Sequence, residues 1–216
     1  MYPISYEADF NPTPNRWTTF FRLILAIPWI IVALVYLIVF AITHFIGWIA
    51  VIILGRYPEG LFNFNSGMIR FFVRTGAWVY LQTDEWPPFG IGDDPNYPIR
   101  ITFVRPERQS RLKAFFRFIL VLPLEIVIYL GIGYLHSAAA TVAWLTIVFR
   151  GYMPEGINNV LTFVNGLYAR VGGYVTVLTD DYPPIGLEAA KPSASGGVVQ
   201  PPAPPVPPTP PAAPAV

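Results

Sequence analysis

The fold is decided by residues 28–60, which read PWIIVALVYLIVFAITHFIGWIAVIILGRYPEG. The first 27 residues of this stretch are apolar with few exceptions. A helix of that length spans about 40 Å, against roughly 30 Å for the hydrocarbon core of a bilayer. In the last six residues the first glycine can end a helix, the proline stops it, and the second glycine allows a tight return. The stretch therefore predicts a tilted membrane-crossing helix followed by a hairpin turn.

The same plan occurs twice in the chain. Matching segments stand 95 residues apart at first and 96 residues apart from Trp48 onward. The clearest pairs are Tyr2-Pro3-Ile4 with Tyr97-Pro98-Ile99, Phe20-Phe21-Arg22 with Phe115-Phe116-Arg117, the turn 55–60 with 151–156, and Thr83-Asp84 with Thr179-Asp180. The chain is therefore predicted to hold two tandem copies of one unit. Since one added residue turns a helix by about 100°, we expect the copies to differ in phase between positions 28 and 48.

Each copy predicts an extended segment, a long apolar helix, a turn and a second helix. The extended segments cover 2–9 and 97–105, and the second alternates in the manner of a strand. We place the first membrane repeat at 1–90, a linker at 91–96, the second membrane repeat at 97–187 and a tail at 188–216. The tail has nine prolines from Pro201 onward, a composition that predicts disorder with polyproline II character.

The composition indicates that lipid is the solvent of much of the chain. Hydrophobic residues make up 54% of the 216 residues and charged residues 12%, whereas soluble domains carry about 25% charged residues. A net charge of +1 gives no strong field that would attract nucleic acid. The absence of cysteine excludes disulfides, thiol catalysis and cysteine-ligated metals. The chain is therefore predicted to be an integral membrane protein that does not bind nucleic acid.

The second helical segments, 61–82 and 157–178, allow two arrangements. Their polar stripes suit a helix lying flat in the interface, and equally a spanning helix that turns its polar face into a bundle. Basic residues precede both long helices. By the positive-inside rule, both helices are therefore expected to enter the membrane from the cytoplasm. Two copies of the same orientation need an even number of crossings each. We therefore predict a mainly α, integral membrane fold of two tandem helical hairpins, with about four membrane-crossing helices and both termini cytoplasmic.

Polar residues in the second helical segments form a candidate intramembrane polar site. Arg70, Arg74 and Arg170 would each destabilise the chain by a few kcal/mol at mid-membrane unless paired. Asn63 and Asn159 share their helical faces. The site could line an anion path or bind a lipid phosphate. Its arginines could also simply pair with the first helix of their own hairpin.

A second candidate set consists of ion pairs at the cytoplasmic interface. Arg22 precedes the first long helix and Asp84 follows the second helical segment, and Arg117 and Asp180 stand in the same places in copy two. We expect each Arg–Asp pair to close its hairpin. Recognition of lipid headgroups or of a partner by the arginines is the alternative.

No set of residues suggests catalysis, a metal site or a cofactor. His44 and His136 lie in apolar helices and do not match each other across the repeat. Each could be a hydrogen-bonded residue inside the bundle, or else a proton relay or haem ligand. Phosphate-loop, dinucleotide and zinc-protease motifs are absent from the sequence. A non-enzymatic protein without a cofactor is therefore predicted.

Three motifs carry a family resemblance: Arg-x-x-x-Phe-Phe-Arg at 16–22, Gly-Arg-Tyr-Pro-Glu-Gly-Leu-Phe at 55–62 and Thr-Asp-Glu-Trp-Pro-Pro-Phe at 83–89. They resemble the bacterial membrane domain catalogued as domain of unknown function 4389. The resemblance covers about 2–89 and 97–186, and copy two departs from it at Met153 and Ile185. It implies a multi-pass protein of the bacterial inner membrane and supplies no activity.

These observations lead to one functional hypothesis and an alternative. We expect a non-enzymatic accessory or scaffold component of a membrane assembly, embedded in the lipid bilayer, with the proline-rich tail as the site for a membrane-protein partner. The alternative is a small transporter or channel in which Arg70, Arg74 and Arg170 line an anion or lipid-phosphate path. Four crossings would need a homo-oligomer to enclose that path. An enzyme acting on a lipid ranks third.

Overall fold

The computed structural model describes residues 2–184 and is mainly helical, as the sequence predicts. The elements in chain order are β1 (Ile4–Ala8), α1 (Arg16–Phe20), α2 (Arg22–Leu25), α3 (Ile27–Leu54), α4 (Glu59–Val79), β2 (Ile99–Phe103), α5 (Arg111–Phe115), α6 (Arg117–Val127), the π-helical turn η1 (Ile128–Ile132), α7 (Gly133–Arg150) and α8 (Glu155–Val175). The predicted tail at 188–216 lies outside the described residues.

Each copy folds as a helical hairpin whose ends follow local backbone chemistry. Pro28 lies in the first turn of α3, where its missing N–H leaves no hydrogen bond unmade. Gly55 and Gly151 end α3 and α7 in the left-handed conformation, with φ of 69° and 79°. Glu59 and Glu155 lie in the first turns of α4 and α8, where the helix dipole favours an acid.

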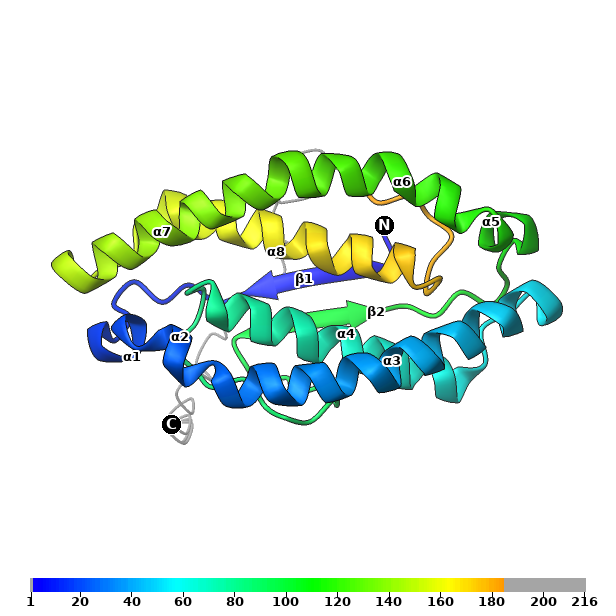
Figure 1. Ribbon diagram of the computed structural model, residues 1–216, viewed down its shortest axis with the longest axis horizontal. Coiled ribbons are helices and arrows are strands. Elements are labelled where there is room, and N and C mark those ends of the chain that lie inside the picture. The colour runs from blue at the N-terminus through cyan, green and yellow to red at the C-terminus, as the bar shows by residue number, and fades with distance from the viewer. Residues whose placement is uncertain (1, 185–216) are drawn as a thin grey trace, which may run out of the picture.

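The two copies run antiparallel to each other. β1 pairs with β2 in an antiparallel register that places Tyr6 opposite Ile101. These two residues are the same position of the unit, 95 residues apart, so the sheet is centred on a pseudo-twofold axis between the copies. Figure 1 shows α3 and the α6–α7 segment running in opposite directions. The prediction that both copies share one orientation is therefore wrong, because it counted charges before each helix and took no account of pairing between copies.

Each copy completes its packing with elements of the other copy. β1 lies along α8, where a Cβ atom on Gly173 would overlap the side chain of Ile4. Trp48 of α3 donates a hydrogen bond from Nε1 to the carbonyl of Ala114 in α5, at 2.8 Å. At the other end of the molecule α1 packs against α7 in the equivalent way. The two copies therefore form one interlocked body.

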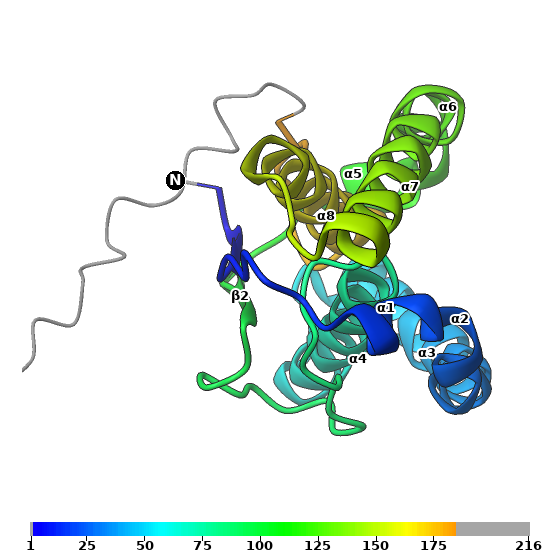
Figure 2. The same cartoon turned by 90° about the vertical axis from the view of Figure 1, so that its left-hand side faces the viewer.

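The elements form three layers, which Figure 2 shows end-on. The sheet lies on one side, α4 and α8 form the middle, and α3 with the α6–α7 segment forms the opposite side. Large buried side chains such as Phe71 and Leu161 come from the middle layer. The outer helices instead point apolar side chains away from the protein, and only 11% of the most apolar part of α3 is buried.

The extra residue of copy two is absorbed by the π-helical turn η1. A π turn closes over one more residue than an α turn, so the buried face continues in phase from α6 into α7. Before the turn Val121 is buried like Ala26, 95 residues earlier. After the turn Ile147 is buried like Val51, 96 residues earlier. The predicted phase difference is therefore wrong, because the helix widens locally instead of rotating.

Within residues 2–184, α3 is the one helix that is long and apolar enough to cross a membrane, by length and composition. The second predicted span, 123–149, is divided among α6, η1 and α7 and carries Glu125 and His136. Pro123 lies inside α6, whereas Pro28 lies in the first turn of α3. The described residues therefore contain one candidate span, whereas four were predicted.

Candidate functional site between the two hairpins

Two of the predicted intramembrane arginines hold the sheet against α4. Arg70 donates from Nε to the carbonyl of Ile101 at 2.9 Å, and Arg74 donates from Nε to the carbonyl of Ile99 at 3.0 Å. Arg74 also donates from both terminal nitrogens to carbonyls of the loop that precedes β2. Its Nη2 lies 3.6 Å from the carboxylate of Asp93. Both guanidinium groups are therefore engaged by the backbone of β2 and its loop.

The other three residues of the predicted polar site do not join these arginines. Arg170 is buried in α8 on the side of β1, since its guanidinium and Tyr6 both lie against Gly166. Asn63 and Asn159 are exposed near the starts of α4 and α8. The predicted site is therefore divided into sheet-anchoring arginines and surface asparagines.

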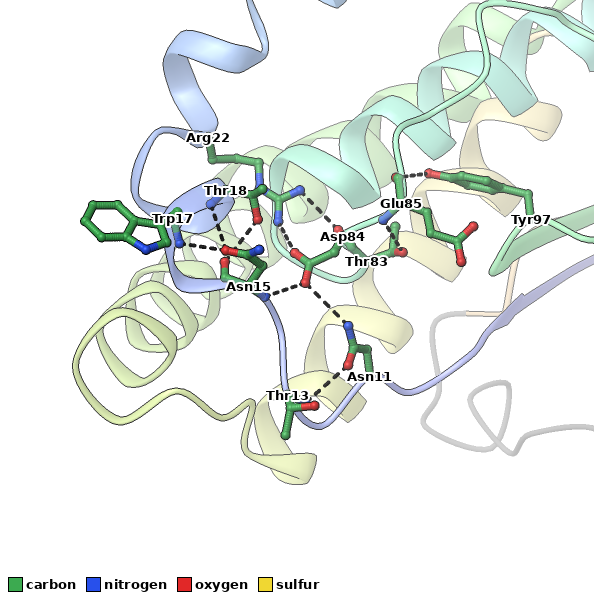
Figure 3. Close-up of polar contacts among 10 residues, drawn as sticks. All are labelled: Asn11, Thr13, Asn15, Trp17, Thr18, Arg22, Thr83, Asp84, Glu85 and Tyr97. Atoms are coloured by element: carbon green, nitrogen blue, oxygen red, sulfur yellow. Dashed lines mark hydrogen bonds and ion pairs between the residues drawn. The ribbon is translucent and has the colours of Figure 1, made fainter.

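The second predicted set lies where each hairpin closes (Figure 3). Arg22 Nη2 lies 2.7 Å from Asp84 Oδ1, and Arg22 Nη1 donates to the carbonyl of Thr83 at 3.1 Å. The guanidinium lies 4.6 Å above the ring of Trp78. Asp84 also accepts the backbone N–H of Asn15, the N-cap residue of α1. One carboxylate therefore ties the end of the hairpin to the helix that leads into it.

Copy two repeats this closure. Arg117 Nη2 lies 2.9 Å from Asp180 Oδ1, and the guanidinium lies 4.1 Å above the ring of Tyr174. Asp180 accepts the backbone N–H of Ser110, the N-cap residue of α5. Arg117, like Arg22 in copy one, is only 2% exposed. These pairs therefore act as structural ties in both copies.

A cavity of about 350 Å³ lies between the two hairpins, where α3, α4, α7 and α8 meet. Ten of its lining residues are equivalent pairs that stand 96 residues apart. They are Phe40 and His136, Ile69 and Asn165, Phe72 and Tyr168, Gly76 and Gly172, and Tyr80 and Thr176. The cavity therefore lies on the pseudo-twofold axis.

The two walls of the cavity differ in polarity. At three equivalent positions copy one supplies two phenylalanines and an isoleucine, whereas copy two supplies a histidine, an asparagine and a tyrosine. None of the lining residues is charged. An apolar cavity with a few convergent polar groups is the usual composition of a small-molecule site.

His136 is a lining residue with an unsatisfied hydrogen-bonding atom. Its side chain is 2% exposed, and its ring stacks on Tyr80 with centroids 3.7 Å apart. Within residues 2–184 its Nε2 atom is buried without a hydrogen-bond partner. Asn165 on the same wall is instead held by Gln82, whose Oε1 accepts from Nδ2 at 2.6 Å. An unpaired buried polar atom is destabilising by about 1–3 kcal/mol, so a ligand oxygen at this place would be favourable.

Sequence reasoning missed this cavity although part of the signal was present. His136 was compared with His44, and the two histidines do not match across the repeat. At the offset of 96 residues the counterpart of His136 is Phe40. The signal was therefore a polar residue in copy two at a position that is apolar in copy one. Residues 2–184 hold no group of three or more histidine and acidic side chains that could bind a metal ion.

The fold and these contacts define a class: a mainly helical protein built by internal duplication, with apolar outer helices and a cavity on the axis between the copies. The chain belongs to the family described as domain of unknown function DUF4389, whose model matches residues 16–90 and again residues 111–185. The prediction of two tandem copies of this domain is confirmed. No curated protein and no solved structure matches the chain.

Proposed function

We propose that this is a non-enzymatic membrane protein that lies flat in one face of the bacterial cell membrane and serves as an accessory or scaffold component of a membrane assembly. The observation that carries the proposal is the exposed apolar surface along the outer helices, with a sheet that carries charged pairs on the opposite side of the molecule.

The apolar face is too long for a simple crossing. Exposed apolar side chains run from Trp17 through α1, α2 and α3 to Leu54, a path of 38 residues. At 1.5 Å per residue this path approaches about 55 Å, well beyond the roughly 30 Å of a hydrocarbon core. Copy two continues the face from Leu112 to Phe149. Helices lying in the plane of the membrane can bury all of this surface.

The sheet lies on the side away from the outer helices (Figure 2) and near the middle of their length (Figure 1), and it carries charged pairs. Arg100 of β2 pairs with Asp9 at 2.7 Å and with Glu7 at 3.6 Å, and its hydrogen bonds lower the pKa of the Asp9 carboxyl. If the helices crossed the bilayer, these charges would lie at mid-depth, where no water can satisfy them. The flat orientation keeps the sheet in water, and we therefore favour it over four crossings.

The contacts of the arginines weigh against the transporter alternative. An anion path would need guanidinium groups that face an open passage. Arg70 and Arg74 instead donate hydrogen bonds to the carbonyls of β2 and its loop. An accessory or scaffold role needs no such passage, and we propose the proline-rich segment at 188–216 as the site that meets a membrane-protein partner.

The orientation can be tested with single cysteines, because the natural chain has none. Suitable exposed positions are Glu59, Glu85, Glu155 and Asp181. Each cysteine variant would be treated with a membrane-impermeant maleimide in intact cells and again after lysis.

Three arrangements give three labelling patterns. The flat orientation predicts that all four cysteines react on the same side. If the observed fold crossed the membrane, Glu59→Cys and Asp181→Cys would react on one side and Glu85→Cys and Glu155→Cys on the other. Four crossings by copies of one orientation would group Glu59→Cys with Glu155→Cys. Either of the last two patterns would overturn the flat orientation.

The scaffold role is tested by purification from native membranes in mild detergent. The full chain is compared with a chain truncated after Leu187. A stoichiometric partner that is recovered only with the full chain is the expected result. The same homo-oligomer in both samples would contradict the scaffold role.

A further inference from the structure

The lining of the cavity on the pseudo-twofold axis includes one buried histidine. His136 lines the cavity, and its Nε2 atom has no hydrogen-bond partner in the described part of the chain. Its equivalent in copy one, Phe40, lines the same cavity and offers no polar atom. At this position the two related walls therefore differ by one buried hydrogen-bonding group.

The shape and composition of the walls favour a flat ring. Phe72, Tyr80 and Tyr168 line the cavity together with His136 and Phe40. Aromatic side chains pack well against flat rings in stacked or edge-on arrangements. The His136 ring lies on the Tyr80 ring at 3.7 Å, so this stack fixes the plane in which Nε2 can form a hydrogen bond. A volume of about 350 Å³ is within the range of small-molecule sites.

The head of the ligand has to be uncharged. No aspartate, glutamate, lysine or arginine lines the cavity, and a charge placed there would be desolvated without a partner. A neutral imidazole can use Nε2 to donate to a carbonyl oxygen. A ring that carries carbonyl groups meets both requirements.

Part of the cavity wall belongs to the apolar side of the molecule. α4 and α8 pack against each other and close the cavity toward the sheet. The remaining walls come from α3 and α7, the outer helices with exposed apolar side chains. A ligand that enters between these helices comes from their surroundings, which we have proposed to be the lipid.

We infer that the cavity binds the ring of an uncharged quinone-type lipid. A ring carbonyl accepts a hydrogen bond from His136 Nε2, and the apolar tail leaves between α3 and α7. The lipid source of the ligand rests on the proposed function, whereas the ring site rests on the cavity itself.

The test measures binding of menadione, a naphthoquinone without a long tail, to the full chain in detergent. Farnesol serves as an apolar alcohol without a ring. His136→Phe copies the residue of copy one and keeps a flat ring at the same place. Tyr134→Phe is the matched control, because Tyr134 lies in the same helix as His136 but is exposed and does not line the cavity. Phe72→Trp is a second variant that fills the cavity and leaves His136 unchanged.

We expect saturable binding of menadione that is weakened about fivefold to tenfold by His136→Phe, the effect of one lost hydrogen bond. Tyr134→Phe should bind like the natural chain, and Phe72→Trp should abolish binding. Thermal unfolding without ligand verifies that each variant is folded. Absence of saturable binding would overturn the inference. So would unchanged affinity in folded His136→Phe and Phe72→Trp, or tighter binding of farnesol than of menadione.

The two proposals fail separately. Binding in detergent does not depend on how the protein lies in a bilayer. Two-sided cysteine labelling with menadione binding intact would overturn the flat orientation alone. One-sided labelling without menadione binding would overturn the ring site alone.

Discussion

Phe40 and His136 occupy the same position of the duplicated unit, and both side chains line the cavity between the hairpins. The pseudo-twofold axis brings equivalent positions of the two copies together. A difference between the copies at the axis therefore becomes a difference between two walls of one cavity. Duplication supplies the symmetric space, and the residues of copy two make one wall polar.

The closing ion pairs should dominate the stability of the hairpins. Asp84→Asn would leave Arg22, which is 2% exposed, without its charge partner. We expect the free energy of unfolding to fall by about 3–5 kcal/mol, because a buried charge is left uncompensated. Thermal or urea unfolding in detergent measures it. Asp9→Asn is the matched control, since Asp9 and its partner Arg100 are 59% and 33% exposed and the loss of this pair should change stability by less than about 1 kcal/mol. Equal losses in both variants would contradict this account.

The π turn should be removable without loss of the fold. Deleting Gly131 shortens copy two to the length of copy one and lets η1 become an α turn. We expect the helical circular dichroism and the melting temperature to change little, since α7 keeps its phase. Deleting Ala41 from α3, which has no π turn, should rotate half of that helix by about 100° and unfold the protein. A folded Ala41 deletion, or an unfolded Gly131 deletion, would show that the π turn does not absorb the extra residue.

Arg74 should control the order of the sheet. Arg74→Ala removes the donors for three backbone carbonyls of β2 and its loop. We expect amide hydrogen exchange in β1 and β2 to become about tenfold faster or more, because local opening then needs less free energy. Hydrogen exchange with mass spectrometry detects the change. Arg56→Ala, an exposed arginine in the turn after α3, should leave the exchange of the strands unaltered.

Tyr57 should make the fold sensitive to alkaline pH. Burial raises the pKa of the Tyr57 phenol to about 12, against a hydrogen bond from Asn65 that lowers it. The unfolded chain ionises this group near pH 10, so its contribution to stability is present below about pH 10 and is lost as the pH rises to about 12.

Tyr57→Phe should therefore reduce the fall in unfolding free energy between pH 10 and pH 12 by about 1–3 kcal/mol. Urea unfolding at several pH values measures this slope. Tyr152→Phe, in the turn of copy two and exposed, serves as the control. Copy two has Met153 at the position of Tyr57, so the effect belongs to copy one alone. An unchanged slope in Tyr57→Phe would assign the alkaline loss to other groups.

Much of the local structure could be predicted because its causes lie close together in the sequence. The Gly-x-x-Pro-Glu-Gly turns end one helix and begin the next at Gly55 and Gly151. The residues proposed to close the hairpins stand at helix boundaries, and the structure brings both Arg–Asp pairs within 3 Å. Positions such as Asn63 were assigned to the polar site from helical spacing alone, and that spacing does not say which side of α4 is covered.

By itself the sequence determined the duplication, the helical hairpins, the apolar character of the outer helices and the family. These follow from residue type and spacing, since backbone conformation and transfer to lipid are local properties. Only the tertiary structure decided that the copies run antiparallel, that their strands and lead-in helices are exchanged, that a π turn restores the phase, and that His136 meets Tyr80. These depend on pairing between residues far apart in the chain. Such pairing depends on the total surface that the two copies bury together. A local sequence pattern does not contain that information.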